Sequence, residues 1–240
     1  MNGGRVRRAR FLTALVSVVL ALWSIQRFQT AQPEPEDTSW PIVFGARTST
    51  ISIATAHLQG ANDAPWVIVE FADFECAYCA DFAARTMPAI RTKYLSTGHV
   101  AFAFMHMPAP TIVRTQALPA AQAAECLGRL GFFWEGHDAL YKADLASGVG
   151  DAKATLLAFA EERGTSPEFQ SCLAEEVQAA IAEHAAIAYD LGIVSTPTFI
   201  IGRRIGQDLI EIVTQIRGAA DIARFSQVLD GLSGGVGQRP

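Results

Sequence analysis

The chain has 240 residues, half of them hydrophobic and 18% charged, which is enough for one large domain with a sizeable core. Its formal net charge of −5 gives no reason to expect a nucleic-acid partner. The sequence contains neither an internal repeat nor a long low-complexity tract.

Residues 1–30 indicate a targeting segment. An apolar run at residues 11–23 is preceded by Arg5, Arg7, Arg8 and Arg10. This order is typical of a signal peptide or of an N-terminal membrane anchor, and no clean cleavage site decides between them. Residues 31–46 form a polar, Pro-rich, acidic linker. We therefore expect the rest of the chain to lie outside the cytoplasm, where disulfides persist.

Alternating strands and helices are predicted from residue 47 to residue 233. The first half contains strands at residues 50–53, 66–72 and 100–105, with a helix at residues 79–95 before the third strand. Pro88 should kink that helix. Three further helices are predicted at residues 117–130, 132–142 and 151–162.

A long helix is predicted next, because Phe169, Leu173, Val177 and Ile181 recur every fourth residue and form one stripe that ends near Gly192. A hairpin of strands at residues 198–201 and 209–213 and a final amphipathic helix complete the domain. Residues 234–240 are Gly-rich and expected to be disordered. The predicted fold is thus a small α/β sheet with a helical insertion at about residues 112–192.

Cys76 and Cys79 are separated by two residues, where the strand at residues 66–72 gives way to a helix. Free backbone N–H groups at a helix start stabilise a thiolate. We therefore expect Cys76 to be an exposed nucleophile and Cys79, one turn later, to be a shielded resolving thiol. The alternative is half of a zinc site, which usually needs a second close pair of ligands. The other two cysteines are far apart and the five histidines form no ligand pair in sequence, so no metal site is predicted.

Glu70 lies inside the apolar strand, six residues before Cys76. Burial would raise the pKa of this carboxyl group. Counting back along the strand places it under the cysteine pair, where it can exchange a proton with Cys79 through a water molecule. The alternative is a strand glutamate that faces solvent or pairs with an arginine. Asp73 and Glu75 are expected to be exposed loop residues, and Glu75 would oppose thiolate formation at Cys76.

Residues 71–79, FADFECAYC, resemble the active-site signature of the DsbA-like thiol:disulfide oxidoreductases. Three later segments also fit that family, and they lie at residues 125–126 with 131–140, at 169–173 and at 195–202. The resemblance implies a thioredoxin-like fold, with the helical insertion between a β-α-β half and a β-β-α half. It further implies disulfide exchange with exported cysteine-containing proteins, recycling by a membrane redox partner, and no metal or organic cofactor.

The resemblance also assigns roles to residues near the cysteine pair. A cis-proline at Pro197 would lie against the pair, so that Thr196 and Pro197 form a wall facing the substrate. Phe74 and Tyr78 are expected to contact the substrate as well. The direction of the reaction stays open. An oxidase is expected, but Ala77 replaces a proline common in the family, so a reductase or isomerase, or a non-catalytic binding protein, remains an alternative.

Cys126 and Cys172 fall on separate predicted helices of the insertion. Several family members have a second disulfide here, and two cysteines of one subdomain tend to pair in an oxidising compartment. We therefore expect a structural disulfide, the alternative being two buried free thiols. His106 and His137 are expected to be structural, hydrogen-bonded residues and not catalytic bases.

Overall fold

The computed structural model describes residues 49–109, 115–175 and 177–234. The predicted targeting segment, the linker and the tail at residues 235–240 lie outside these ranges, so those predictions stay predictions. Within the described ranges, no helix is both long and apolar enough to cross a membrane. All described residues belong to one compact unit, Ile42–Pro240.

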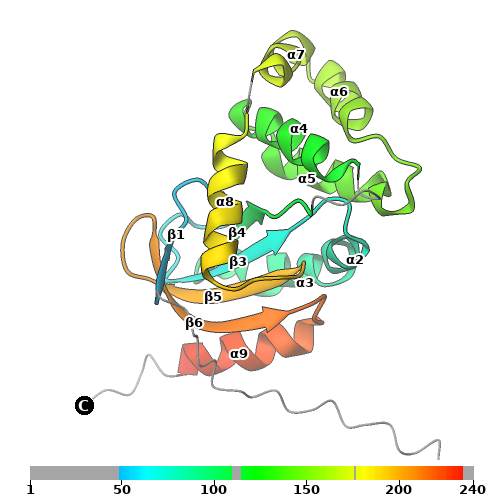
Figure 1. Ribbon diagram of the computed structural model, residues 1–240. Helices are drawn as coiled ribbons and strands as arrows, with labels where there is room; N and C mark the ends of the chain where they lie inside the picture. Colours follow the sequence, from blue (N-terminus) through cyan, green and yellow to red (C-terminus); the bar gives the residue numbers. More distant parts are fainter. Residues whose placement is uncertain (1–48, 110–114, 176, 235–240) are drawn as a thin grey trace, which may run out of the picture. The chain divides into compact units, whose positions relative to one another are not determined.

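Six strands of the described ranges form one mixed sheet (Figure 1). In chain order they are β1 (Thr50–Ser52), β2 (His57–Gln59), β3 (Trp66–Ala72), β4 (Val100–His106), β5 (Thr198–Arg204) and β6 (Leu209–Arg217). Their order in the sheet is β1-β6-β5-β3-β4-β2, with β3 and β4 parallel and the other pairs antiparallel. Because β3 is central and covered on both faces, it is apolar except at Glu70.

The described helices separate into those on the sheet and those of the insertion. In chain order they are α2 (Ala77–Arg85), α3 (Met87–Lys93), the short 3₁₀ helix η1 (Leu95–Thr97), α4 (Ala117–Arg129), α5 (Phe133–Lys142), the 3₁₀ helix η2 (Leu145–Ser147), α6 (Ala152–Glu162), α7 (Ser166–Ala174), α8 (Ala179–Asp190) and α9 (Ile222–Gly234). The predicted thioredoxin-like α/β fold, with helices inserted between two sheet-forming halves, is confirmed.

Helices cover both faces of the sheet. Because side chains alternate along a strand, Ile68 points to one face and Val69 to the other. Ile68 packs in a cluster with Phe82 of α2, Ile90 of α3 and Phe225 of α9. Val69 belongs to a second cluster that includes residues of α8, which lies on the side of the sheet away from α9 (Figure 1). Glu70, two residues after Ile68, therefore points towards the α2 side.

The insertion has an apolar core of its own, built from α4 to α7. Leu127, Leu140, Leu156 and Phe169 are fully or almost fully buried there, and the same cluster includes both Cys76 and Cys79. The insertion helices therefore pack directly behind the cysteine pair. A disulfide between Cys126 of α4 and Cys172 of α7 joins two of these helices, with Cα atoms 5.7 Å apart.

Two helix predictions were wrong. The helix predicted at residues 79–95 is two helices, because α2 ends at Arg85 and Pro88 lies at the start of α3, where its missing N–H costs little. The predicted long helix is also two, since the backbone at Glu175 is extended between α7 and α8. The apolar stripe continues across this break, but α7 packs on α4 and α6 whereas α8 packs on the sheet.

Candidate active site

The cysteine pair lies at the start of α2, just after the C-terminal end of β3. Cys76 is the N-cap residue of α2, and Cys79 lies in its first turn. Both are free thiols. The expectation that Cys76 is exposed was wrong, because only 2% of the residue is accessible. The loop before β5 covers it, and Sγ of Cys76 lies 3.4 Å from the carbonyl oxygen of Thr196.

The surroundings of Cys76 lower its pKa from 9.0 to about 5. The largest cause is the hydrogen bond from the thiol of Cys79, and the side chain of Thr196 and the backbone N–H groups of Tyr78 and Cys79 act in the same direction. Burial opposes them, as does donation by the protonated thiol to the Thr196 carbonyl. The donors outweigh these effects, so Cys76 is the thiolate of the pair at neutral pH.

Cys79 and Glu70 respond to burial in the opposite way. Desolvation raises the pKa of Cys79 well above its ordinary value, and the neighbouring Cys76 and Glu70 raise it further. Glu70 is 1% exposed, and desolvation followed by the charge of Cys76 raises the pKa of its carboxyl group. Oε1 of Glu70 is buried without a hydrogen-bond partner among the described residues. The site therefore combines one thiol whose pKa is lowered, Cys76, with a thiol and a carboxyl group whose pKa values are raised.

The predicted wall residues lie beside the pair. The Thr196–Pro197 peptide bond is cis, as the resemblance implies, and Thr196 contacts Cys76 directly. Tyr78 is 70% exposed, so its ring is available at the surface next to the pair. Phe74 is different, because it is only 2% exposed and stacks on Phe104 with ring centroids 5.2 Å apart. The expectation that Phe74 contacts a substrate is therefore corrected, since it is a core residue beneath the site.

Asp73 and Glu75 are buried, contrary to the expectation that they are exposed. Each carboxylate accepts hydrogen bonds from the backbone. Asp73 accepts from Glu75 N–H at 2.8 Å and from Ala109 N–H at 3.1 Å. Glu75 accepts from the N–H groups of Gln116 and Ala117 at 2.9 and 2.8 Å, at the start of α4. Glu75 thus caps an insertion helix, and its charge is not among the causes of the Cys76 shift.

Tyr141 is a neighbour of the site that the sequence did not reveal. Its hydroxyl group is buried without a hydrogen-bond partner among the described residues. Desolvation raises the pKa of this phenol, and the charges of Cys79 and Glu70 raise it further. Its ring lies 5.1 Å from that of Phe74. Because the residue comes from α5, sixty-two positions after Cys79, no motif near the cysteines points to it.

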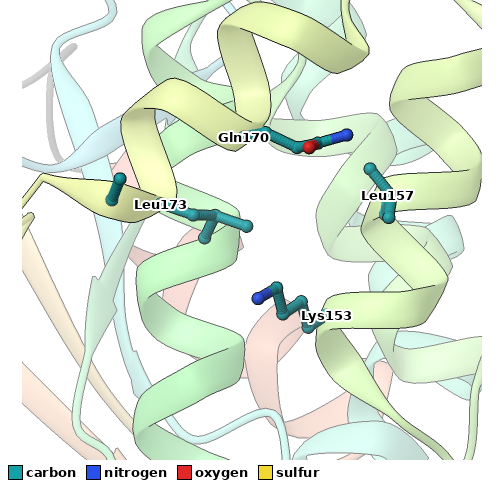
Figure 2. Close-up of a pocket in the computed structure, with 5 residues that line it drawn as sticks. Lys153, Leu157, Gln170 and Leu173 are labelled. Atoms are coloured by element: carbon teal, nitrogen blue, oxygen red, sulfur yellow. The ribbon is translucent and has the colours of Figure 1, made fainter.

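A pocket of about 320 Å³ lies between α6 and α7, away from these residues (Figure 2). It is lined by Lys153, Leu157, Gln170, Leu173 and Ala174. None of the predicted site residues lines it, and it contains no nucleophile or acid–base pair. The site is instead the surface where Cys76 meets the cis-proline loop. Within the described ranges, the side chains placed to share a metal ion include neither cysteine, so the zinc alternative for the pair has no further ligand there.

Comparison with known families agrees with this geometry. The model of a family described as Thioredoxin matches residues 52–216. The chain belongs to the thioredoxin family. Among solved structures, it matches alpha-DsbA1 of Wolbachia pipientis with a TM-score of 0.63 and 23% identity, over 75% of this chain and 91% of that one. DsbA2 of Pseudomonas aeruginosa gives a TM-score of 0.58 at 23% identity, over 76% and 97% of the two chains. The DsbA-like form of the fold is thus confirmed.

The curated relatives match this chain over a smaller share of their own length than the solved structures do. A Na⁺/H⁺ antiporter NhaA 3 of Salinispora tropica is 38% identical over 151 residues, which are 62% of this chain and 22% of that protein. A putative protein-disulfide oxidoreductase of Rickettsia bellii is 26% identical over 59% of this chain and 55% of that protein. The chain therefore spans between about a fifth and about half of the length of these two relatives.

Proposed function

We propose that this chain is a thiol:disulfide oxidoreductase that exchanges disulfides with exported proteins through Cys76 and Cys79. The observation that carries the proposal is the opposite shift of the two thiol pKa values beside the cis bond at Pro197. A protein that only binds peptides has no use for an ionised thiol held next to a protonated one. The relative described as a putative protein-disulfide oxidoreductase supports the same chemistry.

In the oxidising direction, a substrate thiolate attacks Sγ of Cys76 in the disulfide form of the pair. The bond between Cys76 and Cys79 breaks, and Cys79 takes the electron pair. Glu70, whose carboxyl pKa is raised by burial, would supply the proton that Cys79 needs. A second substrate thiolate then attacks the substrate sulfur bound to Cys76, and Cys76 leaves as a thiolate. The substrate loses two electrons, and the pair gains them.

The low pKa of Cys76 supports the oxidising direction. A thiol that is ionised at neutral pH is a good leaving group in the second step. The covered Sγ and its contact with the Thr196 carbonyl also support one mode of substrate binding. An extended peptide that displaces the cover would pair its backbone with the residues before Pro197, and Tyr78, exposed beside the pair, would contact its side chains.

An extracytoplasmic location is supported by two features. The Arg-rich and apolar segment at residues 5–23 has the order of an export signal. The disulfide between Cys126 and Cys172 is of a kind that persists in oxidising compartments. An oxidase there consumes its own disulfide, so a membrane-bound two-electron oxidant would have to restore it. Ion transport is not proposed, because the antiporter relative shares only 22% of its length with this chain.

The test is the equilibrium of the Cys76–Cys79 pair with glutathione, combined with the oxidation of a reduced, unfolded substrate protein. We expect a potential above that of thioredoxin, which is about −270 mV, and substrate oxidation that is lost in Cys76→Ser. A potential at or below that of thioredoxin would favour a reductase. A Cys76→Ser variant that binds unfolded chains as the wild type does, together with a wild type that oxidises nothing, would leave only a binding protein.

A further inference from the structure

His57, His106 and Glu125 converge on one point at the junction between the sheet and the insertion. His57 comes from β2, His106 ends β4, and Glu125 lies in the middle of α4. One ligand atom of each lies within 4.8 Å of the other two. Nε2 of His57 is 2.8 Å from Oε1 of Glu125, and Nε2 of His106 is 2.9 Å from the same oxygen. Two ring nitrogens and one carboxylate oxygen thus face a common centre.

Hydrogen bonding accounts for part of this cluster, because Nε2 of His57 is hydrogen-bonded to Oε1 of Glu125 at 2.8 Å. Nε2 of His106 lies 2.9 Å from the same oxygen, a close contact that falls outside the geometry of a good hydrogen bond. A third histidine lies next to these residues. His184 lies against His106 with ring centroids 5.7 Å apart; its Nδ1 accepts the backbone N–H of His106, and its buried Nε2 has no hydrogen-bond partner in the described structure. Three imidazole rings thus lie close to one carboxylate.

The surroundings hold the cluster in place. His57 stacks on Phe133 with ring centroids 3.5 Å apart and an angle of 6° between the rings. It also lies over Gly128 of α4, where a Cβ atom would come within 2.7 Å of Cε1 of His57. A glycine is therefore needed for the helix to approach this ring. His106 is 1% exposed, whereas the side chain of His57 is 18% exposed, so the cluster is buried on one side and open to solvent at the edge of His57.

We propose that His57, His106 and Glu125 bind a single divalent ion of the zinc type. Imidazole nitrogen and carboxylate oxygen are ligands that Zn²⁺ accepts, at about 2.0–2.2 Å, and three protein ligands with a water in the fourth position form a common arrangement. Tetrahedral ligands around such an ion lie roughly 3.3 Å apart. The contacts at 2.8 and 2.9 Å would therefore open by a few tenths of an ångström, and a pair near the 4.8 Å limit would close by about 1.5 Å. The exposed edge at His57 supplies the water and the route of entry.

The ion would fasten α4 to the edge of the sheet. β2 is a three-residue edge strand that pairs only with β4 among the described strands, so it gains most from a further tie. α4 is also the helix that Glu75 caps and that carries one half of the disulfide. This role does not depend on the redox chemistry of Cys76 and Cys79, and the site is separate from that pair.

The test is a calorimetric titration of the metal-free full chain, produced without an affinity tag, with ZnCl₂. Cys76 and Cys79 are kept as a disulfide so that no thiol competes for the ion. We expect one Zn²⁺ per chain and a rise in melting temperature on binding. His57→Gln should weaken binding by more than the roughly 10- to 100-fold that loss of an outer-shell partner costs. The matched control is His99→Gln, which replaces an exposed histidine and should bind as the wild type does.

Glu125→Gln forms a second pair with the control Glu135→Gln, whose side chain is exposed. Equal affinity in the wild type and His57→Gln, or no saturable binding by the wild type, would overturn the proposal. If either cluster variant fails to fold, X-ray absorption of the wild-type zinc complex decides. Two imidazoles and otherwise oxygen ligands are expected, and a shell without imidazole would refute the site. None of these outcomes bears on disulfide exchange.

Discussion

The pH dependence of alkylation at Cys76 is the sharpest test of the site. With a pKa of about 5, this thiol is about 99% ionised at pH 7, against about 1% for a thiol of pKa 9.0. A thiolate of lower pKa is also a weaker nucleophile, and a Brønsted coefficient of about 0.45 makes it roughly 60-fold slower per ionised molecule. The two effects nearly cancel at pH 7, so a single neutral rate is uninformative.

At pH 5 the two effects no longer cancel. About half of Cys76 is ionised there, against roughly one ordinary thiol in ten thousand, which leaves an advantage of about 80-fold after the correction for nucleophilicity. The rate of reaction with iodoacetamide should therefore rise with a midpoint near pH 5 and level off by neutral pH. The cover over Sγ lowers every rate but does not move the midpoint. Thiolate absorbance in the ultraviolet measures the same ionisation without needing access.

Two variants of Cys79 test whether its thiol causes the low pKa of Cys76. The thiol of Cys79 is the largest contributor to the lowered pKa, so Cys79→Ala should move the Cys76 midpoint upward. Cys79→Ser keeps a hydroxyl donor at the same place and should leave the midpoint lower than in the alanine variant. A wild-type midpoint near 9, or the same midpoint in both variants, would refute the reasoning.

Three further predictions concern buried groups around the site. The folded reduced protein keeps a proton on Glu70 that the unfolded chain releases above the ordinary pKa of 4.5, so burial of this group lowers the free energy of unfolding as pH rises. Glu70→Gln should therefore gain stability relative to the wild type as pH rises above 4.5, and a difference in urea unfolding that is independent of pH would contradict this. Tyr141→Phe removes a hydroxyl without a hydrogen-bond partner in the described structure; the free energy of unfolding should stay the same or rise by up to about 1 kcal/mol, and a loss larger than that would mean that the hydroxyl is satisfied. Replacing both Cys126 and Cys172 by alanine opens a link across 46 positions and should cost about 4 kcal/mol in urea unfolding, whereas a loss below about 1 kcal/mol would show that α7 stays on α4 without it.

Local patterns predicted the elements whose environment is uniform along the chain. β3, β4 and β5 were found because each is an apolar run, and α4, α5 and α6 because their apolar residues follow the helical period. β2 was missed. It has three residues and becomes a strand only by pairing with β4. The false long helix shows the same limit, since a stripe predicts a buried face but not which layer buries each half.

The features of the candidate site divide in the same way, into those that a short stretch of sequence shows and those that it does not. The spacing of Cys76 and Cys79 and the burial of Glu70 are visible in one short stretch of sequence. The cover on Cys76 comes from Thr196, 120 positions later. The partners of Glu75 lie 41 and 42 positions away. The grouping of His57, His106 and Glu125 spans three elements with no common spacing. These features depend on how distant segments are brought together, which no window along the chain contains.

The pKa of Cys76 also limits how high the redox potential of the Cys76–Cys79 pair can be. Only the reduced pair contains the thiolate, so every interaction that lowers the pKa of Cys76 stabilises the reduced protein and raises the potential. Compared with a thiol of pKa about 7, as in thioredoxin, a pKa of about 5 gains about 2.3 kcal/mol at pH 7, or about 50 mV for two electrons. Added to the roughly −270 mV of thioredoxin, this contribution alone would give about −220 mV, well short of the roughly −120 mV of DsbA. A measured potential close to −120 mV would mean that the oxidised form is destabilised by something other than the ionisation of Cys76.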